Sequence, residues 1–244
     1  MMIDLHTHIL PGIDDGSDSM EETLRMIELA VESGTKEIVA TPHCNIPGSY
    51  DNYYGEWYDE LFDETKRTIE SHFDIKVYPG MEVFLTYDID HLIDESHVIT
   101  INQSHYMLVE FGFGENEDFA FMMLDKILKK DLIPILAHVE RFRFIQRHPE
   151  LVTKLIDKGV VIQVNKGSFA GHFGKKEQQT AYYLLRHKLI HFIASDAHGS
   201  NYRTPYMRDI FNSLKLDCPD EYLRLLFEMN PKHILKDERV IKYR

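Results

Sequence analysis

The chain has 244 residues, of which 43% are hydrophobic, 27% charged and 11% aromatic. This length and composition fit one large folded domain, or at most two small ones. Lysine and arginine number 27 against 40 aspartate and glutamate, which gives a net charge of −13. The phosphates of a nucleic acid would be repelled by most of such a surface, so we expect no nucleic-acid partner.

Cysteine content and hydropathy indicate where in the cell the protein is located. Two cysteines, Cys44 and Cys218, cannot build a disulfide framework. No apolar run approaches the roughly 20 residues that span a bilayer, and the first residues lack the basic and apolar regions of a leader peptide. We therefore expect no transmembrane segment and a cytoplasmic location.

Seven short apolar runs have the composition of β-strands, and amphipathic stretches separate them. Strands that alternate with helices predict a mainly parallel sheet, and closure into a barrel is the economical arrangement at this length. We therefore predict an α/β barrel in one domain over residues 1–244. The runs are Met2 to Leu5, Glu37 to Ala40, Ile75 to Val83, Tyr106 to Phe111, Leu132 to Ala137, Val160 to Val164 and Leu189 to Ala194.

The first helix is the best marked in the sequence. Ser19 and Glu22 form a capping box at its start, and Gly34 suits the left-handed position after its last turn. The stretches 42–53 and 166–175 are predicted to be loops above one rim of the barrel. The other predicted helices cover 52–71, 118–130, 149–158, 175–188, 204–215 and 219–229.

Histidines and carboxylates recur where the predicted strands end. Asp4, His6 and His8 occupy alternate positions in and just after the first run, so their side chains point the same way. In a histidine-rich chain this motif is weak by itself and gains weight only from partners. The partners in the loops and at the ends of other runs are Asp14, His43, Glu82, Glu110, His138, Asp196 and His198.

A barrel of parallel strands brings these ends to one face, where five imidazoles and four carboxylates would converge. A single histidine or glutamate at a strand end is usually hydrogen-bonded or solvated. Nine of them together would repel and be costly to bury without a cation, so the pattern predicts a metal centre. The donor types suit divalent Zn, Mn or Fe, and their number suits two or three ions with a bridging carboxylate. We expect nine histidines to lie outside this centre: His72, His91, His97, His105, His148, His172, His187, His191 and His233.

The segments that carry these residues form recognisable motifs. They include Asp4-Leu5-His6-Thr7-His8, Asp14-Asp15-Gly16, Thr41-Pro42-His43, Pro79-Gly80-Met81-Glu82, Val109-Glu110-Phe111, Ala137-His138-Val139-Glu140-Arg141 and Ala194-Ser195-Asp196-Ala197-His198. Together they resemble the PHP superfamily, and within it the manganese-dependent protein-tyrosine phosphatases of Gram-positive capsule and exopolysaccharide operons. The resemblance extends from the first run to Arg203, and more weakly to Asn230-Pro231.

The resemblance implies a distorted (β/α)7 barrel of the PHP type, forming a single metallophosphatase domain. It also implies two or three divalent ions, with Mn first and Fe, Zn or Co as alternatives. Carried over by position, the ligands of the three ions would be His6, His8, Glu82 and Asp196 for one, Glu82, Glu110 and His138 for the second, and Asp14, His43 and His198 for the third.

The same resemblance implies a substrate and a reaction. The substrate would be a phosphotyrosine-containing protein, the C-terminal tail of a bacterial tyrosine kinase, and the role would be regulation of capsule or exopolysaccharide synthesis. Three divalent ions and four carboxylates leave a charge of about +2, which suits a dianionic phosphate monoester. Water activated by the metals would attack phosphorus, and Arg141 and Arg203 would bind the phosphate, unless they form only surface ion pairs.

A thiolate mechanism is not supported by the sequence. The phosphate loop of thiol phosphatases needs an arginine six positions after the cysteine, where Cys44 has Tyr50. Cys218 has Arg224 at that spacing, but Pro219 removes a backbone donor, and the residues after it are acidic. The segment after Cys218 is better explained as the start of the last helix.

Aromatic residues near the predicted rim offer candidate contacts for a phosphotyrosyl ring. The candidates are Tyr50, Tyr53, Tyr54 and Trp57, with helical core as an equal alternative for Tyr54 and Trp57, and also Phe169 and Phe173.

Three other functions compete with a protein-tyrosine phosphatase. A small-molecule phosphatase, acting on histidinol phosphate or a sugar phosphate, would share the metal site and differ in the rim. An exonuclease is disfavoured by the net charge of −13. A regulator that binds a kinase without turnover is disfavoured because every ligand and both arginines are present.

Overall fold

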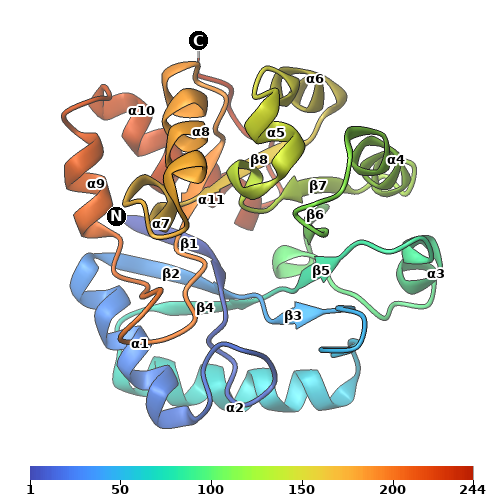
Figure 1. Ribbon diagram of the computed structural model, residues 1–244. Coiled ribbons are helices and arrows are strands. Elements are labelled where there is room, and N and C mark those ends of the chain that lie inside the picture. Colours follow the sequence, from blue (N-terminus) through green and yellow to red (C-terminus); the bar gives the residue numbers. More distant parts are fainter. Residues whose placement is uncertain (244) are drawn as a thin grey trace.

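The computed structural model describes residues 1–243, with the strands at the centre and helices around them (Figure 1). Every pairing between the strands named below is parallel. The hydrogen-bonded orders are β1-β2-β4 and β3-β5-β6-β7-β8-β9. The strands of the described chain are β1 (Met2–Thr7), β2 (Thr35–Ala40), β3 (His43–Cys44), β4 (Lys76–Pro79), β5 (Glu82–Phe84), β6 (Tyr106–Glu110), β7 (Ile133–Leu136), β8 (Val161–Asn165) and β9 (Phe192–Ala194).

The two sheets are parts of one curled sheet. Strand β2 leads directly into β3, and β4 leads into β5, so each pair acts as one interrupted strand. The amide of Glu82 donates to the carbonyl of Pro42 across this interruption, at 3.0 Å. On the other side, the amide of Asp196 donates to the carbonyl of His6 at 2.9 Å, which joins β9 to β1. Seven strand paths therefore close into the distorted (β/α)7 barrel that the sequence predicted.

The predicted strand over residues 75–83 is broken at Gly80, and this detail of the prediction is wrong. A Cβ atom at Gly80 would lie 2.9 Å from the Ile101 side chain and 3.0 Å from that of Val39, so this close approach requires glycine. The Tyr58 hydroxyl donates to the carbonyl of Gly80 and accepts from its amide. The predicted loop over 42–53 likewise contains a short strand, β3.

The predicted helices are present, with shifted ends. The second begins at Glu56 instead of residue 52, and the last continues through a π-helical segment over Leu225–Met229 to Leu235. Three short helices, α3, α5 and α7, were not predicted. The helices are α1 (Met20–Ser33), α2 (Glu56–His72), α3 (Ile89–Asp94), α4 (Glu117–Leu128), α5 (Arg143–Arg147), α6 (Leu151–Lys158), α7 (Lys166–Phe169), α8 (Lys175–Arg186), α9 (Arg208–Leu214), α10 (Asp220–Arg224) and α11 (Asn230–Leu235).

The ends of α1 follow the sequence signals with one exception. Ser19 Oγ accepts from the amide of Glu22, and Gly34 adopts φ 97° at the carboxyl end. The Glu22 carboxylate does not return to Ser19 as a capping box requires. It accepts from the amide and hydroxyl of Ser200, and so ties α1 to the loop after β9.

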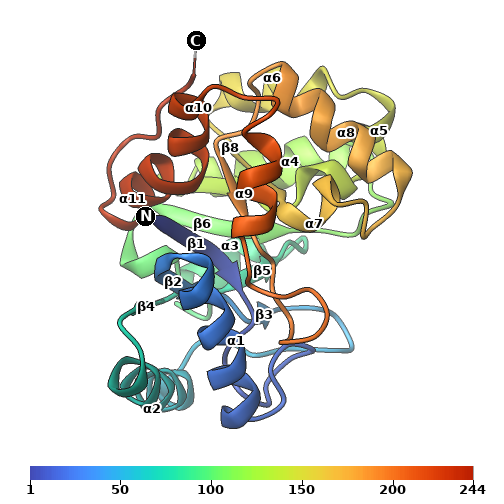
Figure 2. The ribbon, with the colours of Figure 1, turned by 90° about the vertical axis from the view of Figure 1, so that its left-hand side faces the viewer.

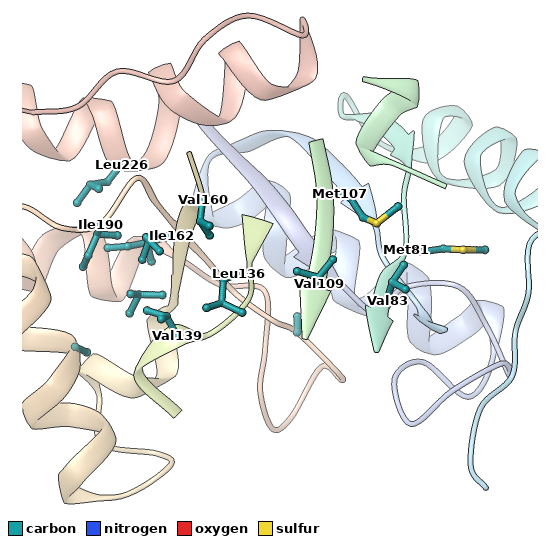
Figure 3. Close-up of a cluster of buried hydrophobic side chains, with 14 of the residues drawn as sticks. Met81, Val83, Met107, Val109, Leu136, Val139, Val160, Ile162, Ile190 and Leu226 are labelled. Carbon is teal, nitrogen blue, oxygen red and sulfur yellow. The ribbon is translucent and has the colours of Figure 1, made fainter. Parts of the chain in front are cut away.

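Two apolar clusters hold the barrel together. The larger cluster packs the outer strand faces against the helices, as Val83, Val109, Leu136 and Ile162 show in Figure 3. We place the smaller cluster on the concave side of the sheet. Its residues include Ile3, Leu5, Val39, Leu108, Ile135, Val161 and Phe192 from six strands, and Ile234 and Leu235 of α11. In the described chain, no helix combines the length and apolar character needed to cross a membrane.

Candidate metal centre

Histidines and carboxylates gather at the carboxyl ends of the strands. His6 lies in β1 with His8 just beyond it, Glu110 ends β6, and His138 follows β7. Glu82 reaches the same place as the first residue of β5, directly after the break at Gly80. All nine residues predicted as metal ligands lie in or beside this group.

One cluster consists of His6, His8, Glu82 and Asp196, and all four side chains are buried. His6 Nε2 lies 3.2 Å from Glu82 Oε2 and 3.4 Å from Asp196 Oδ1. His8 Nε2 lies 3.4 Å and 3.5 Å from the same two oxygens. These four atoms surround one point, as the predicted ligands of the first ion should.

A second cluster shares Glu82 with the first. His43 Nδ1 lies 3.0 Å from Glu82 Oε2 and 3.2 Å from Glu110 Oε1. His138 Nε2 lies 2.8 Å from Glu82 Oε1 and 3.5 Å from Glu110 Oε2. The two oxygens of Glu82 thus face different partners, which is the arrangement a bridging carboxylate needs.

A third cluster contains Asp15, whereas the predicted ligand at this place was Asp14. Asp15 Oδ1 lies 3.4 Å from His43 Nε2 and 3.4 Å from His198 Nε2. Asp14 is instead occupied by protein donors: Oδ2 accepts from His8 Nδ1 at 2.7 Å and from the His43 amide at 2.9 Å. Asp14 therefore orients two histidines, while Asp15 presents its carboxylate to the cluster.

The loop after β1 explains why the two adjacent aspartates differ. A Cβ atom at Gly16 would lie 2.3 Å from His8 Cβ, so only glycine allows the loop to fold back onto β1. The amide of Gly16 then donates to Asp14 Oδ1 at 3.0 Å. This turn fixes Asp14 beneath the histidines and leaves Asp15 half-exposed at the rim.

The cluster has the unmatched donors and acceptors of a cation site. Glu82 Oε2, His43 Nδ1 and His198 Nε2 are buried and make no hydrogen bond within the described chain, although each lies close to a possible partner. Burial lowers the pKa of His43, but the neighbouring Glu82 and Glu110 outweigh it and raise that pKa to about 10. Burial raises the pKa of Glu82, yet His6 and His43 bring it well below its usual range. Divalent cations fit this donor set, because they would replace the protons that now balance the carboxylates.

A buried amide network beneath the clusters was missed from the sequence. Gln163 Oε1 lies 3.3 Å from His6 Nδ1 and accepts from the His138 amide at 2.7 Å. Its Nε2 donates to Asn165 Oδ1, and Asn165 Nδ2 donates to Asp196 Oδ2. Such partners orient ligands in metal sites. The available signal was a glutamine inside the apolar run of β8.

Both predicted arginines stand beside Asp196. Arg203 Nη2 lies 2.5 Å from Asp196 Oδ2, and Arg141 Nη1 lies 3.8 Å from the same oxygen. The Arg141 guanidinium also lies between two rings, 4.2 Å from the centre of Phe113 and 4.6 Å from that of Phe173. Arg203, His138 and Asp196 all have positive φ, and such backbone conformations concentrate at functional sites.

The aromatic candidates separate into rim and core. Tyr50 stacks on His43 with an angle of 7° between the rings. Phe173 covers both arginines, but Phe169 is buried against Tyr182, so its predicted contact with substrate is wrong. The other candidates are held by their own neighbours: Tyr53 by Asn45, Tyr54 by Asp59, and Trp57 by the carbonyl of Tyr53.

The cysteines are unsuited to nucleophilic chemistry. Cys44 is buried, and burial raises the pKa of its thiol to about 12. Burial and Asp217 raise the pKa of Cys218 to about 11. Both therefore remain protonated thiols near neutral pH.

Fold and site together define a class of protein, a seven-stranded α/β barrel with a histidine and carboxylate centre at the carboxyl ends of its strands. A family model described as capsular polysaccharide synthesis, CpsB/CapC, matches residues 2–236, and the chain belongs to this family. It is 32% identical over 241 residues to tyrosine-protein phosphatase YwqE of Bacillus subtilis (strain 168), covering 99% of this chain and 94% of that protein.

Solved structures agree with this assignment. Crystal structures of YwqE from Bacillus subtilis and CpsB from Streptococcus pneumoniae, described as unique metal-dependent tyrosine phosphatases, match with a TM-score of 0.90 at 32% identity. That match covers 99% of this chain and 97% of the other. A mutant organophosphorus hydrolase matches with a TM-score of 0.65 at 9% identity, covering 96% and 92%, which shows likeness of fold alone.

Proposed function

We propose that this protein is a metal-dependent phosphatase that removes phosphate from phosphotyrosine in proteins. The observation that carries the proposal is the cluster of buried imidazoles and carboxylates with two arginines at its edge. The family relatives named as tyrosine-protein phosphatases support the substrate class. The family description supports capsule or exopolysaccharide synthesis as the process. The resemblance noted in the sequence extends the proposal to the tail of a bacterial tyrosine kinase as the protein substrate.

The proposed ligands follow the geometry of the three clusters. His6, His8, Glu82 and Asp196 would hold one ion. Glu82, Glu110 and His138 would hold a second, because His138 Nε2 lies 2.8 Å from Glu82 Oε1 and 3.5 Å from Glu110 Oε2. Asp15, His43 and His198, which lie close to His8, would hold a third. The proposal of Mn rests on the resemblance to manganese-dependent phosphatases, and Fe, Zn or Co are alternatives that suit the same donors. Divalent ions at these sites would lower the pKa of water and neutralise part of the phosphate charge.

The remaining residues of the site bind and orient the substrate. Arg141 and Arg203 provide planar guanidinium groups that bind phosphate oxygens through charge-assisted hydrogen bonds. The rings of Phe113 and Phe173 hold Arg141 in place and keep its surroundings apolar, which strengthens its interaction with an anion. Tyr50, stacked on His43 at the rim, offers a face to the tyrosyl ring of the substrate.

Asp14 orients the imidazole of His8, and Gln163 orients that of His6. Each accepts from, or lies against, an imidazole Nδ1 whose Nε2 belongs to the first cluster. The two thiols take no part, since both are protonated near neutral pH. Unpaired cysteines are also what a reducing cytoplasm favours, and we propose that location.

One experiment tests the reaction and the substrate class together. Metal content is measured on the purified protein, and turnover is then compared on p-nitrophenyl phosphate, a phosphotyrosyl peptide and histidinol phosphate. Chelation should abolish turnover and added Mn should restore it, with the phosphotyrosyl peptide preferred over histidinol phosphate. The double variant Cys44→Ser/Cys218→Ser should stay active. Loss of activity in that variant with its metal intact, or preference for histidinol phosphate, would overturn the proposal.

A further inference from the structure

A groove lies between α5 and α8, on the side of the barrel that also carries Arg141. The two helices run side by side in both views of the ribbon (Figures 1 and 2) and are joined by a hydrogen bond from Gln146 Nε2 to Glu177 Oε1, at 3.0 Å. The groove has a volume of about 740 Å³. Its charged lining residues are Arg143, Arg147, Lys176 and Glu177.

The three cations of this groove are exposed and have no acidic partner. None of Arg143, Arg147 and Lys176 forms an ion pair with a carboxylate of the described residues, although the chain has an excess of acidic groups. Glu177 is the one acidic residue of the lining, and Gln146 already binds it. A positive surface of this kind on a protein of net charge −13 is suited to an anionic ligand.

The start of α8 adds to the positive potential. This helix has 12 residues, and its N-cap Gly174 provides no side chain to cap the first turn. Lys175 and Lys176 stand in that turn together with Glu177, so two positive side chains and one negative side chain lie at the positive end of the helix dipole. An anion in the groove would balance the unpaired charges of Arg143, Arg147 and Lys176.

Residues that line the groove lie close in the chain to Arg141 and Phe173 of the phosphate site. Arg143 follows Arg141 by two residues, and Gln146 Nε2 donates to the carbonyl of Arg141 at 3.3 Å. Lys176 follows Phe173, whose ring covers the Arg141 guanidinium, by three residues. Three residues of extended chain span about 10 Å, so the backbone of Lys176 lies within that distance of Phe173, and a peptide residue three or four positions from the phosphotyrosine has a similar reach.

We propose that the groove between α5 and α8 binds acidic side chains of the substrate, located about three or four residues from the phosphotyrosine. This inference rests on the proposed function, because it describes how the same site selects among phosphotyrosyl proteins. The groove then acts as a specificity subsite, in which Arg147 and Lys176 attract glutamate or aspartate of the peptide. Arg141 and Arg203 remain responsible for the phosphate.

The test compares matched phosphotyrosyl peptides. One set has two glutamates at the third and fourth positions before or after the phosphotyrosine, a second has glutamine there, and a third has lysine. Wild type should show kcat/KM about five- to tenfold higher for the better glutamate peptide than for its glutamine counterpart, mainly through KM. Raising the salt concentration to 0.5 M should remove most of this preference.

Variants then locate the preference in the groove. Arg147→Gln/Lys176→Gln should bring the ratio of the two kcat/KM values to about one, and Arg147→Glu/Lys176→Glu should favour the lysine peptide. The control Arg67→Gln/Lys76→Gln removes two exposed cations from α2 and β4, far from α5 and α8, and should keep the wild-type ratio (Figure 1). The single variants Arg147→Gln and Lys176→Gln replace the double one if it does not fold.

The outcomes separate this proposal from the proposed function. If wild type hydrolyses none of the phosphotyrosyl peptides, the proposed function fails. If it hydrolyses glutamate and glutamine peptides with equal kcat/KM, the function stands and the groove proposal is overturned. A preference that survives in Arg147→Gln/Lys176→Gln, or disappears equally in the control, would also overturn it.

Discussion

On the concave face of the sheet, the amino ends of the strands carry apolar side chains and the carboxyl ends carry ionisable ones. In β6, Tyr106 and Leu108 belong to the concave apolar cluster, while Glu110, two residues further on, belongs to the candidate metal centre. Phe192 and Ala194 of β9 belong to the same apolar cluster, and Asp196 lies two residues beyond. A change from apolar to ionisable residues therefore occurs within one strand, over about 7 Å.

Stability therefore comes mainly from the half of the barrel at the amino ends of the strands, and reactivity from the half at their carboxyl ends. Burying an aliphatic side chain such as Leu108 contributes about 2 kcal/mol. Burying carboxylates such as Glu82 and Asp196 costs free energy unless cations or donors balance them. Apolar burial therefore stabilises the amino half of the barrel, while the carboxylates of the carboxyl half need protons or metal ions to balance their charge.

The largest expected effect is at Glu82, which faces two clusters. Glu82→Ala should remove more than one metal ion per chain and lower kcat/KM more than 10³-fold, about 4 kcal/mol in transition-state stabilisation, because both ions lose a shared ligand. Metal analysis and turnover of a phosphotyrosyl peptide measure this. Glu64→Gln, on the exposed face of α2, is the control and should behave as wild type. Full metal content with near-normal turnover in Glu82→Ala would show that the carboxylate is not shared.

The next effect separates phosphate binding from metal binding. Arg141→Ala should lower kcat/KM about 10²- to 10³-fold, since a charged donor is lost from the transition state, and metal content should not change. Arg141→Lys should recover only part of the activity, because an ammonium group cannot bind two oxygens in the same plane. Wild-type kinetics in Arg141→Ala would transfer the role to Arg203 or Arg143.

In the apolar half, the expected effect is on stability alone. Leu108→Ala should lower the free energy of unfolding by about 2–5 kcal/mol, measured by urea denaturation of the metal-free protein, because it leaves a cavity. Metal content of the folded variant should match that of wild type. Leu216→Ala, at a position 89% exposed, should change stability by less than about 0.5 kcal/mol. A loss of metal in Leu108→Ala similar to that in Glu82→Ala would mean that the two halves are not independent.

The smallest effect comes from His191, a buried histidine outside the metal centre. Burial, with a contribution from Lys242, lowers the pKa of His191 to about 4. The unfolded chain, with the ordinary value of 6.5, therefore binds more protons between these two pH values. Stability from this group is complete above pH 6.5 and decreases as the pH falls to about 4.

The size of this decrease follows from the shift in pKa. At pH 4.5 it amounts to about 2–3 kcal/mol. Urea titrations of the chelated protein at pH 7 and 4.5 measure it, and His191→Gln should show a smaller difference between the two pH values than wild type. Equal pH dependence in the two proteins would mean that His191 titrates normally in the fold.

The sequence by itself determined the order of elements and which residues gather as candidate metal ligands at the strand ends. Periodicity marked the seven strand paths, and Ser19 and Gly34 marked the ends of α1, because these signals act over a few neighbouring residues. The positions of His6, His8, Glu110 and His138 at strand ends were visible for the same reason. Parallel strands bring their carboxyl ends to one face, so this juxtaposition follows from the fold class.

Only the tertiary structure decided how neighbouring residues divide their roles. Asp14 and Asp15 are the same residue type in the same loop, and their difference arises because Gly16 packs against His8, which turns one carboxylate inward and leaves the other at the rim. The break at Gly80, the link from Glu22 to Ser200, and the groove beside Arg141 likewise depend on contacts between segments far apart in the chain. Local sequence cannot specify such contacts. They depend on how closely distant parts of the backbone approach and on which buried polar atoms form hydrogen bonds with each other.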